Sequence, residues 1–98
     1  MRTQKPVGSS YGIAIAGTPV VLNTAAPVPS NAARAYFTVD TAAVRWRADG
    51  SNPASGAAGG ILMPIGTTII EGWDVISKMR FIQDVGAAVL NVQYFSVE

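Results

Sequence analysis

Residues 75–95 have the sequence VISKMRFIQDVGAAVLNVQYF, and this stretch decides the fold class. Apolar side chains alternate with polar or basic ones on both sides of Asp84-Val85-Gly86. A period of two is typical of a strand with one face on the core. The Asp and Gly between the two alternating runs favour a turn. We therefore predict a hairpin that joins a strand over residues 75–83 to a strand over residues 87–95.

The segment further upstream shows the same alternation. In residues 43–48, Trp46 lies on one predicted face, and Arg45 and Arg47 lie on the other. Within the predicted hairpin, Phe81 likewise alternates with basic side chains. We predict that Trp46 and Phe81 belong to the core and that the basic side chains face outward.

Turn-forming residues punctuate the whole chain. The sequence contains 10 glycines and 6 prolines, and they recur at intervals too short for a long helix. Asp49-Gly50 and Asn52-Pro53 are strong turn signals. Further strands are expected over residues 11–16, 19–24, 34–40, 61–65 and 67–71. The fold is thus predicted to be all-β, a single-domain sandwich of seven or eight short strands with jelly-roll-like or immunoglobulin-like packing.

The 98 residues suffice for one domain. Residues 1–10 carry few apolar side chains and bury too little surface to become ordered alone. We expect a flexible N-terminal arm over residues 1–10, followed by the β-sandwich domain over residues 11–98. Glycine and proline interrupt the longer apolar stretches, and none approaches the roughly 20 residues of a spanning helix. No membrane segment is expected.

The composition excludes several kinds of catalytic site. The chain has no histidine and no cysteine, so Ser-His-Asp and Cys-His systems and His- or thiolate-bound metals are absent. Most of its 6 carboxylates fall at predicted strand ends or turns. Asp49, Ser51 and Asn52 could offer oxygen ligands to calcium, but the loop lacks the dense acidic spacing of known calcium motifs. We expect no enzymatic activity, no catalytic residues, no metal and no cofactor.

The charges are few and unevenly distributed. There are 7 basic and 6 acidic residues, giving a net charge of +1, and residues 6–33 and 50–70 have no Lys, Arg, Asp or Glu. Long neutral stretches suit a surface that packs against other protein, because no ion must lose its water. A merely neutral, flexible surface is the alternative. The charge is too low to indicate electrostatic binding of nucleic acid.

Four segments together resemble a known family. They are VRWRADGSNPA at residues 44–54, GGILM at 59–63, MRFI at 79–82 and AVLNVQYF at 88–95. Their order is similar to that of small β-rich virion proteins of tailed bacteriophages. In that family a V-R-[WY]-R strand runs into a D-G-x-x-P turn, and a later R-F-I strand precedes a last strand ending in V-x-Y-[FY]. The resemblance covers residues 43–95 and does not distinguish capsid, head–tail junction and tail.

The resemblance implies a structural component of the particle that decorates or cements the capsid. Its expected partners are the major capsid protein and other copies of itself, as a homo-oligomer on the particle. Its expected location is the capsid surface of the virion, and the host cytoplasm during assembly. The residues proposed for these contacts are Val7, Tyr11, Arg45, Arg47, Lys78 and Arg80.

A second interpretation remains open. Trp46, Trp73 or Tyr36 would allow a β-rich module to bind carbohydrate or single-stranded nucleic acid, as in a tail or host-interaction protein. Against a nucleic-acid platform, Arg45 and Trp46 are adjacent in one predicted strand and so point to opposite faces.

Overall fold

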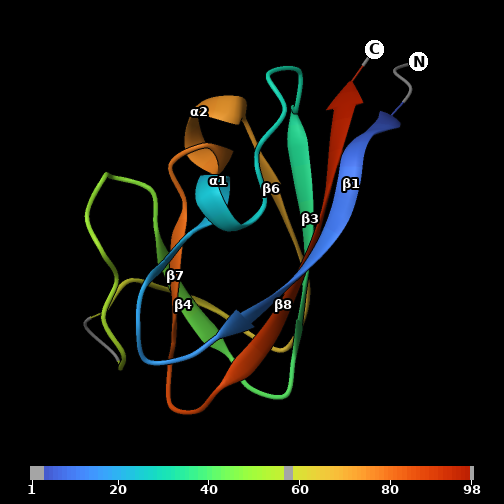
Figure 1. Cartoon of the computed structure of the whole chain (residues 1–98). Helices are drawn as coiled ribbons and strands as arrows, with labels where there is room; N and C mark the ends of the chain where they lie inside the picture. Colours follow the sequence, from blue (N-terminus) through green and yellow to red (C-terminus); the bar gives the residue numbers. More distant parts are fainter. Residues whose placement is uncertain (1–3, 57–58, 98) are drawn as a thin grey trace.

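The computed structural model describes residues 4–56 and 59–97 of the chain. These residues form eight strands and two one-turn helices (Figure 1). In chain order the elements are β1 (Gln4–Ile15), β2 (Val20–Val21), α1 (Leu22–Ala25), β3 (Arg34–Asp40), β4 (Val44–Arg47), β5 (Ile61–Met63), β6 (Gly66–Glu71), α2 (Trp73–Ile76), β7 (Arg80–Gln83) and β8 (Ala88–Val97). The predicted all-β sandwich is confirmed.

The strands form two antiparallel sheets of four. Sheet A has the order β1-β8-β3-β6, and sheet B has the order β2-β7-β4-β5. The first strand thus pairs with the eighth, the second with the seventh, the third with the sixth and the fourth with the fifth. This is the pairing of a long hairpin rolled into two sheets, which is the jelly-roll arrangement. The strand order selects the jelly roll over immunoglobulin-like packing.

Four short connections cross from one sheet to the other. They follow β1, β3, β5 and β7, and the strand registers place all four at the same end of the sandwich, the lower end in Figure 1. We call these four connections arches, and Asp84-Val85-Gly86 belongs to the arch between β7 and β8. The predicted hairpin is therefore wrong, because β7 pairs with β4 and β2 while β8 pairs with β1 and β3. A turn of this length can join two paired strands or two stacked ones, and the alternating pattern is the same in both cases.

The short helices also replace parts of predicted strands. Residues 73–76 form α2, and residues 22–25, within the strand expected over residues 19–24, form α1. In each helix the buried side chain, Leu22 or Ile76, reaches the core from the end of the sandwich. The alternation that places Phe81 inside also predicts Val75 inside, and this is wrong, because the helical turn of α2 buries Ile76 and leaves Val75 exposed.

The N-terminal segment differs from the expected loose arm. Gln4–Ile15 form one strand, and residues 4–7 pair in register with residues 94–97 of β8. The domain boundary expected at Tyr11 therefore falls inside β1. The few apolar side chains of this segment did not reveal it, because a strand added to a sheet edge is stabilised largely by its backbone hydrogen bonds. Residues 1–3 of the expected arm lie outside the described residues.

The core lies between the sheets and is wholly apolar among the described residues. Phe37 of sheet A and Phe81 of sheet B meet at its centre with ring centroids 5.5 Å apart. Both are fully buried, as predicted for Phe81, whereas Trp46 packs against the core but is only partly buried. The exception is the hydroxyl of the buried Tyr94, which donates a 2.5 Å hydrogen bond to the carbonyl of Ala26.

Candidate functional site

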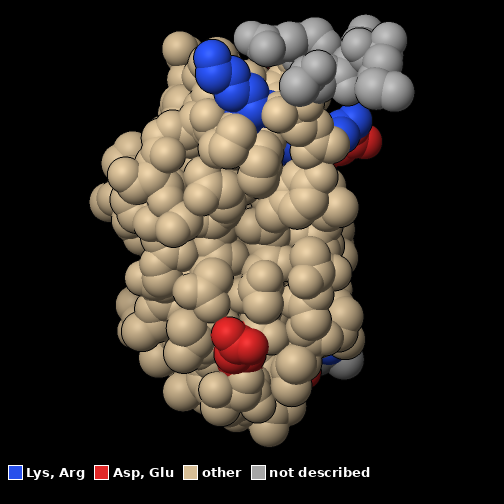
Figure 2. All heavy atoms as spheres, turned by 90° about the vertical axis from the view of Figure 1, so that its right-hand side faces the viewer, with Lys and Arg blue, Asp and Glu red and all other residues tan. Residues whose placement is uncertain are grey.

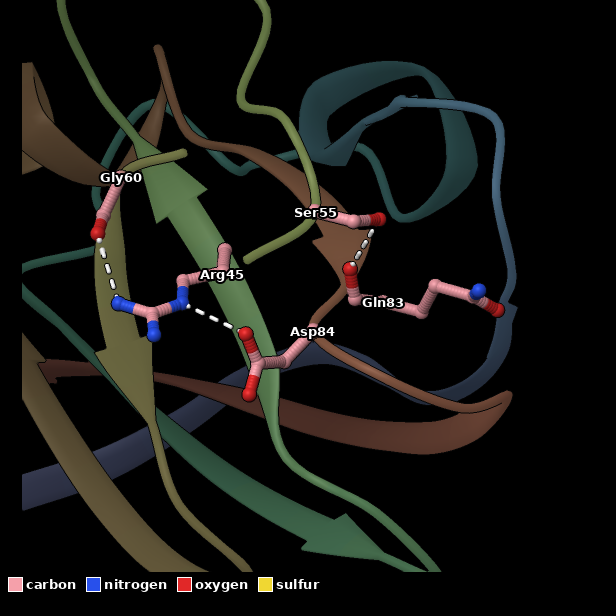
Figure 3. Close-up of polar contacts among 5 residues, drawn as sticks. All are labelled: Arg45, Ser55, Gly60, Gln83 and Asp84. Carbon is pink, nitrogen blue, oxygen red and sulfur yellow. Dashed lines mark hydrogen bonds and ion pairs between the residues drawn. The ribbon is translucent and has the colours of Figure 1, made fainter. Parts of the chain in front are cut away.

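Arg45, proposed as a contact residue, is held within the chain. Its Nε donates a hydrogen bond to Asp84 Oδ1 at 2.9 Å, and its Nη1 donates to the carbonyl of Gly60 at 3.2 Å (Figure 3). The Arg45 and Asp84 side chains expose only 15% and 18% of their surface. This ion pair ties β4 to the arch after β7, and Arg45 has little surface left to offer another protein.

The loop that follows β4 covers part of the outer face of sheet B. Ser55 Oγ donates to the carbonyl of Gln83 at 2.8 Å (Figure 3). Arg80, another proposed contact residue, donates from Nη1 to Asn52 Oδ1 at 2.8 Å. Arg80 thus has a partner in this loop, which spans residues 48–60.

Burial shows how closely the loop lies on the sheet. Ile82 lies opposite Arg45 on the outer face of sheet B, yet it is only 6% exposed. Pro53 of the loop is buried as well. At Gly59 a Cβ atom would lie 1.4 Å from the Ala54 carbonyl oxygen, so only glycine fits this approach.

The two remaining basic contact residues are more accessible. Arg47 hydrogen-bonds through Nε to Asp49 Oδ1 at 3.1 Å, and the pair is largely in solvent. The hydrogen bond from Arg47, supported by the Ser51 amide, holds the pKa of Asp49 below its usual value. Lys78 is exposed in the segment after α2. Arg45, Arg47 and Arg80 therefore share the outer face of sheet B, but the partners of these arginines keep the four basic residues from forming one free basic patch.

Val7 and Tyr11, the apolar contact residues proposed on the arm, face inward. They lie opposite Tyr94 and Val92, whose side chains are buried. Both are partly buried and pack against the core. In the folded chain they therefore contribute to the sandwich itself.

The outer face of sheet A is neutral over most of its area. Figure 2 shows this face, on which charged side chains occur only toward the two ends. Arg34 and Glu71 form one terminal pair, with Arg34 Nε 2.6 Å from Glu71 Oε1. Tyr36 lies between them and the middle of the sheet, with its ring centroid 4.8 Å from that of Phe95.

A shallow hollow of about 240 Å³ opens on this neutral face. Tyr36, one of the residues considered for carbohydrate binding, lines it together with the amides of Asn91 and Gln93. The Tyr36 hydroxyl donates to Gln4 Oε1 at 2.7 Å, which fixes the ring against β1. The hollow thus combines one aromatic ring with neutral hydrogen-bonding groups.

Most of the exposed large apolar side chains lie elsewhere, along the side formed by the edge strands β5 and β6 and by α2. Among the described residues, six of the eight large apolar side chains that are exposed fall between positions 61 and 75. We call these six residues the β5–β6 strip: Ile61, Leu62, Ile65, Ile69, Trp73 and Val75. Their exposed fractions range from 36% at Val75 to 61% at Ile65.

An apolar cleft adjoins this strip. It has a volume of about 430 Å³, and Trp46, Ile61 and Val75 are among the residues that line it. Trp46 is only partly buried because its register partner, Ile61, lies on β5, the free edge strand of sheet B. The cleft shares Ile61 and Val75 with the strip, and Arg47 and Asp49 also line it.

Sequence reasoning missed the strip as a set. The charge-free stretch over residues 50–70 contains four of its six members and was the available signal. Identifying them also required knowing that β5 and β6 are the edge strands of their sheets, and only the topology supplies that.

The described residues contain no cluster of metal-binding side chains. Within residues 4–56 and 59–97, no three His, Cys, Asp or Glu side chains lie close enough together to hold a metal ion. Three carboxylates, Asp49, Glu71 and Asp84, each pair with an arginine. In the same residues, neither helix has the length or apolar character to cross a membrane.

Comparisons with protein-family models, with curated proteins and with solved structures found no match to this chain.

Proposed function

We propose that this protein is a non-enzymatic structural subunit that works by contact with other protein chains, as a component of a bacteriophage particle. The observation that carries the proposal is the β5–β6 strip, in which six exposed apolar side chains follow one another along one side of the sandwich. Contiguous exposed apolar surface on a small domain marks an interaction site, because water contact with it is unfavourable.

The surroundings of the strip fit a protein partner. Residues 50–70 contain no ionisable group, so covering this surface removes the water from few charges. Two charged pairs beside the strip, Arg47 with Asp49 and Arg34 with Glu71, are already formed within the chain, and Asp74 is an exposed carboxylate between Trp73 and Val75 of the strip. Together they form a polar border beside an apolar centre, which is the usual composition of a protein interface.

The particle enters the proposal through the resemblance to small phage virion proteins. The jelly roll occurs in viral capsid and lectin domains and is compatible with that assignment, although a fold alone does not define a function. The proposed partners are the major capsid protein and further copies of this chain, with the protein on the capsid surface. Association with the assembled shell and not with its free subunits would stabilise the shell by mass action. Many copies on one lattice would multiply a modest gain per copy.

The first experiment counts copies. Quantitative mass spectrometry of purified particles should find tens to hundreds of copies per particle if the protein is a shell component. Absence from the particles would refute the proposal, and a few copies only would move the protein from the shell to the tail.

The second experiment tests the strip. Variants Ile61→Ser and Trp73→Ser should remain folded, because both side chains are at least 44% exposed. We expect each to lower binding to particles that lack the protein by about tenfold, which corresponds to about 1.4 kcal/mol at an interface. The matched control is Val85→Ser, at an exposed apolar position on the opposite end of the sandwich from α2. Equal binding by all three variants would exclude the strip.

The hollow on sheet A favours a second candidate function, carbohydrate binding. A sugar could stack its apolar face on Tyr36 while the Asn91 and Gln93 amides exchange hydrogen bonds with its hydroxyls. A glycan array would test this with Tyr36→Ala as the comparison. Binding by the wild-type protein that Tyr36→Ala abolishes would support a host-interaction role.

A further inference from the structure

Strand β6 is an open edge that can accept another strand. Among the described residues it has a neighbour on one side only, namely β3. It spans Gly66–Glu71 and contains no proline, no bulge and no charge before its last residue. Such an edge presents unpaired backbone groups that another chain can pair with.

The hydrogen-bond pattern shows which groups are unpaired. The Gly72 amide donates to the Ala33 carbonyl at 2.8 Å, and these two residues continue the β3–β6 register. Bonded and non-bonded pairs alternate along an antiparallel ladder. The amides and carbonyls of Thr67, Ile69 and Glu71 therefore point away from β3, toward the open edge.

We propose that β6 pairs with β6 of a second copy of this chain, antiparallel and with Ile69 on the two-fold axis. This pairing rests on the proposed function, because it identifies a second copy as one of the protein partners. The two copies of sheet A then form one continuous sheet of eight strands. In this register Ile69 lies opposite its own counterpart, and Thr67 lies opposite Glu71 of the second copy.

The register follows from the strand itself. When the pairing is centred on Ile69, each of the three residues whose backbone groups point outward lies opposite another such residue of the second copy. This gives about six backbone hydrogen bonds. If the two-fold axis passed through Thr68, Glu71 would lie opposite a residue outside β6 of the second copy. If it passed through Ile70, Thr67 would lie opposite a residue outside β6. A centre at Glu71 would set two carboxylates directly opposite each other, which is unfavourable.

Charge and side-chain placement also fit a second copy. With Ile69 on the axis, the two Glu71 side chains stand about 14 Å apart along the strands. Each keeps its own Arg34 partner, whose Nε lies 2.6 Å from the Glu71 carboxylate. On the outer face the two Ile69 side chains, each 50% exposed in the single chain, cover one another. Strand β5 follows the same side of the sandwich, so its exposed apolar residues approach the partner as well.

A single-cysteine experiment tests the register directly. The chain has no cysteine, so Ile69→Cys introduces one reactive thiol per copy. Opposed residues of a hydrogen-bonded pair have Cα atoms about 5.5 Å apart, within the range of a disulfide. We expect Ile69→Cys to form a disulfide-linked dimer under mild oxidation. The matched control, Thr67→Cys, shares its strand and face with Ile69 but lies about 14 Å from its own counterpart and should remain unlinked.

A second experiment measures association without a cross-link. Sedimentation of the wild-type protein should show a dimer, and Ile69→Lys should raise its dissociation constant by at least about tenfold because two like charges then meet at the axis. Val89→Lys is the control, since Val89 is 42% exposed on the same sheet but lies on β8, away from this edge. Circular dichroism should show both variants folded.

The outcomes separate this inference from the proposed function. Efficient cross-linking of Thr67→Cys without Ile69→Cys overturns the register. A wild-type chain that remains monomeric, with Ile69→Cys unlinked, overturns the pairing. If such a chain still binds particles through the β5–β6 strip, the proposed function holds and only the pairing is lost.

Discussion

The two edges of sheet A differ in how readily they can pair with a strand of another chain. β1 forms one edge with 12 residues, yet it carries Pro6, and its register with β8 shifts between Val7 and Tyr11. Gly8 lies at this bulge with φ of 73°, a conformation that favours glycine. β6 forms the other edge with half that length, without proline and without a register shift. Proline and bulges are common means by which proteins block edge-to-edge pairing. One edge is therefore protected and the other is open.

The largest effect is expected from the core that both edges share. Phe81→Ala removes a fully buried ring that contacts Phe37 across the sandwich. We expect the free energy of unfolding to fall by about 3–5 kcal/mol. Chemical denaturation followed by fluorescence measures this value. A loss below about 1 kcal/mol would mean that the packing of the two sheets does not depend on this contact. The stability of each edge would then be independent of the Phe37–Phe81 contact.

A smaller loss of stability is expected beside the protected edge. Tyr94, paired with Val7 of β1, donates to the buried Ala26 carbonyl, and Tyr94→Phe leaves that carbonyl without its donor. We expect a cost of about 1–3 kcal/mol. The matched control is Tyr36→Phe, whose hydroxyl hydrogen-bonds on the surface and should matter less.

The same residue predicts a dependence on pH. Burial raises the pKa of the Tyr94 hydroxyl well above its usual value of about 10, because the phenolate would lose its water. A raised pKa in the folded state means that this contribution is complete below about pH 10 and is lost as the pH rises further. Unfolding measured from pH 8 to pH 11 should show a decline that is weaker in Tyr94→Phe. An identical decline in both proteins would contradict the assignment.

The fold class and most of the strands could be predicted from sequence, but not their pairing. The alternation around Phe37, Phe81 and Leu90 correctly marks which side chains enter the core. It cannot tell an arch from a hairpin, because both put alternate residues inside. The ion pair of Arg45 with Asp84, 39 residues away, is likewise invisible without the topology. Outward-facing arginines were predicted, whereas the loop covering them was not.

Converting the protected edge into an open one sharpens the comparison. Gly8 and Ser9 are the two extra residues between the Val7 and Tyr11 register positions, so deleting them restores regular pairing with β8. The test variant combines this deletion with Pro6→Thr and with Ile69→Lys, which prevents pairing through β6. We expect this variant to self-associate through β1. Sedimentation at several concentrations measures it. A variant that stays monomeric would show that the bulge and proline do not account for the difference between the edges.

The smallest effect is expected at Lys5. This side chain is the one charge that the described part of β1 carries, and charge on an edge strand can also deter pairing. With the bulge and Pro6 still present, Lys5→Ser should leave both the melting temperature and the sedimentation profile unchanged. New association in this variant would assign the protection of β1 to charge and not to backbone shape.

The rolled pairing of strands has a consequence for biosynthesis. β8, the strand made after the other seven, lies between β1 and β3 in sheet A. Until it leaves the ribosome, β1 has no partner and β3 has only β6. At about 5–20 residues per second, β1 waits for some seconds after its own synthesis. Contacts between distant segments slow folding, because their loops must close first. The domain therefore folds as a unit only after β8 has left the ribosome, and shortening the chain within β8 should prevent folding altogether.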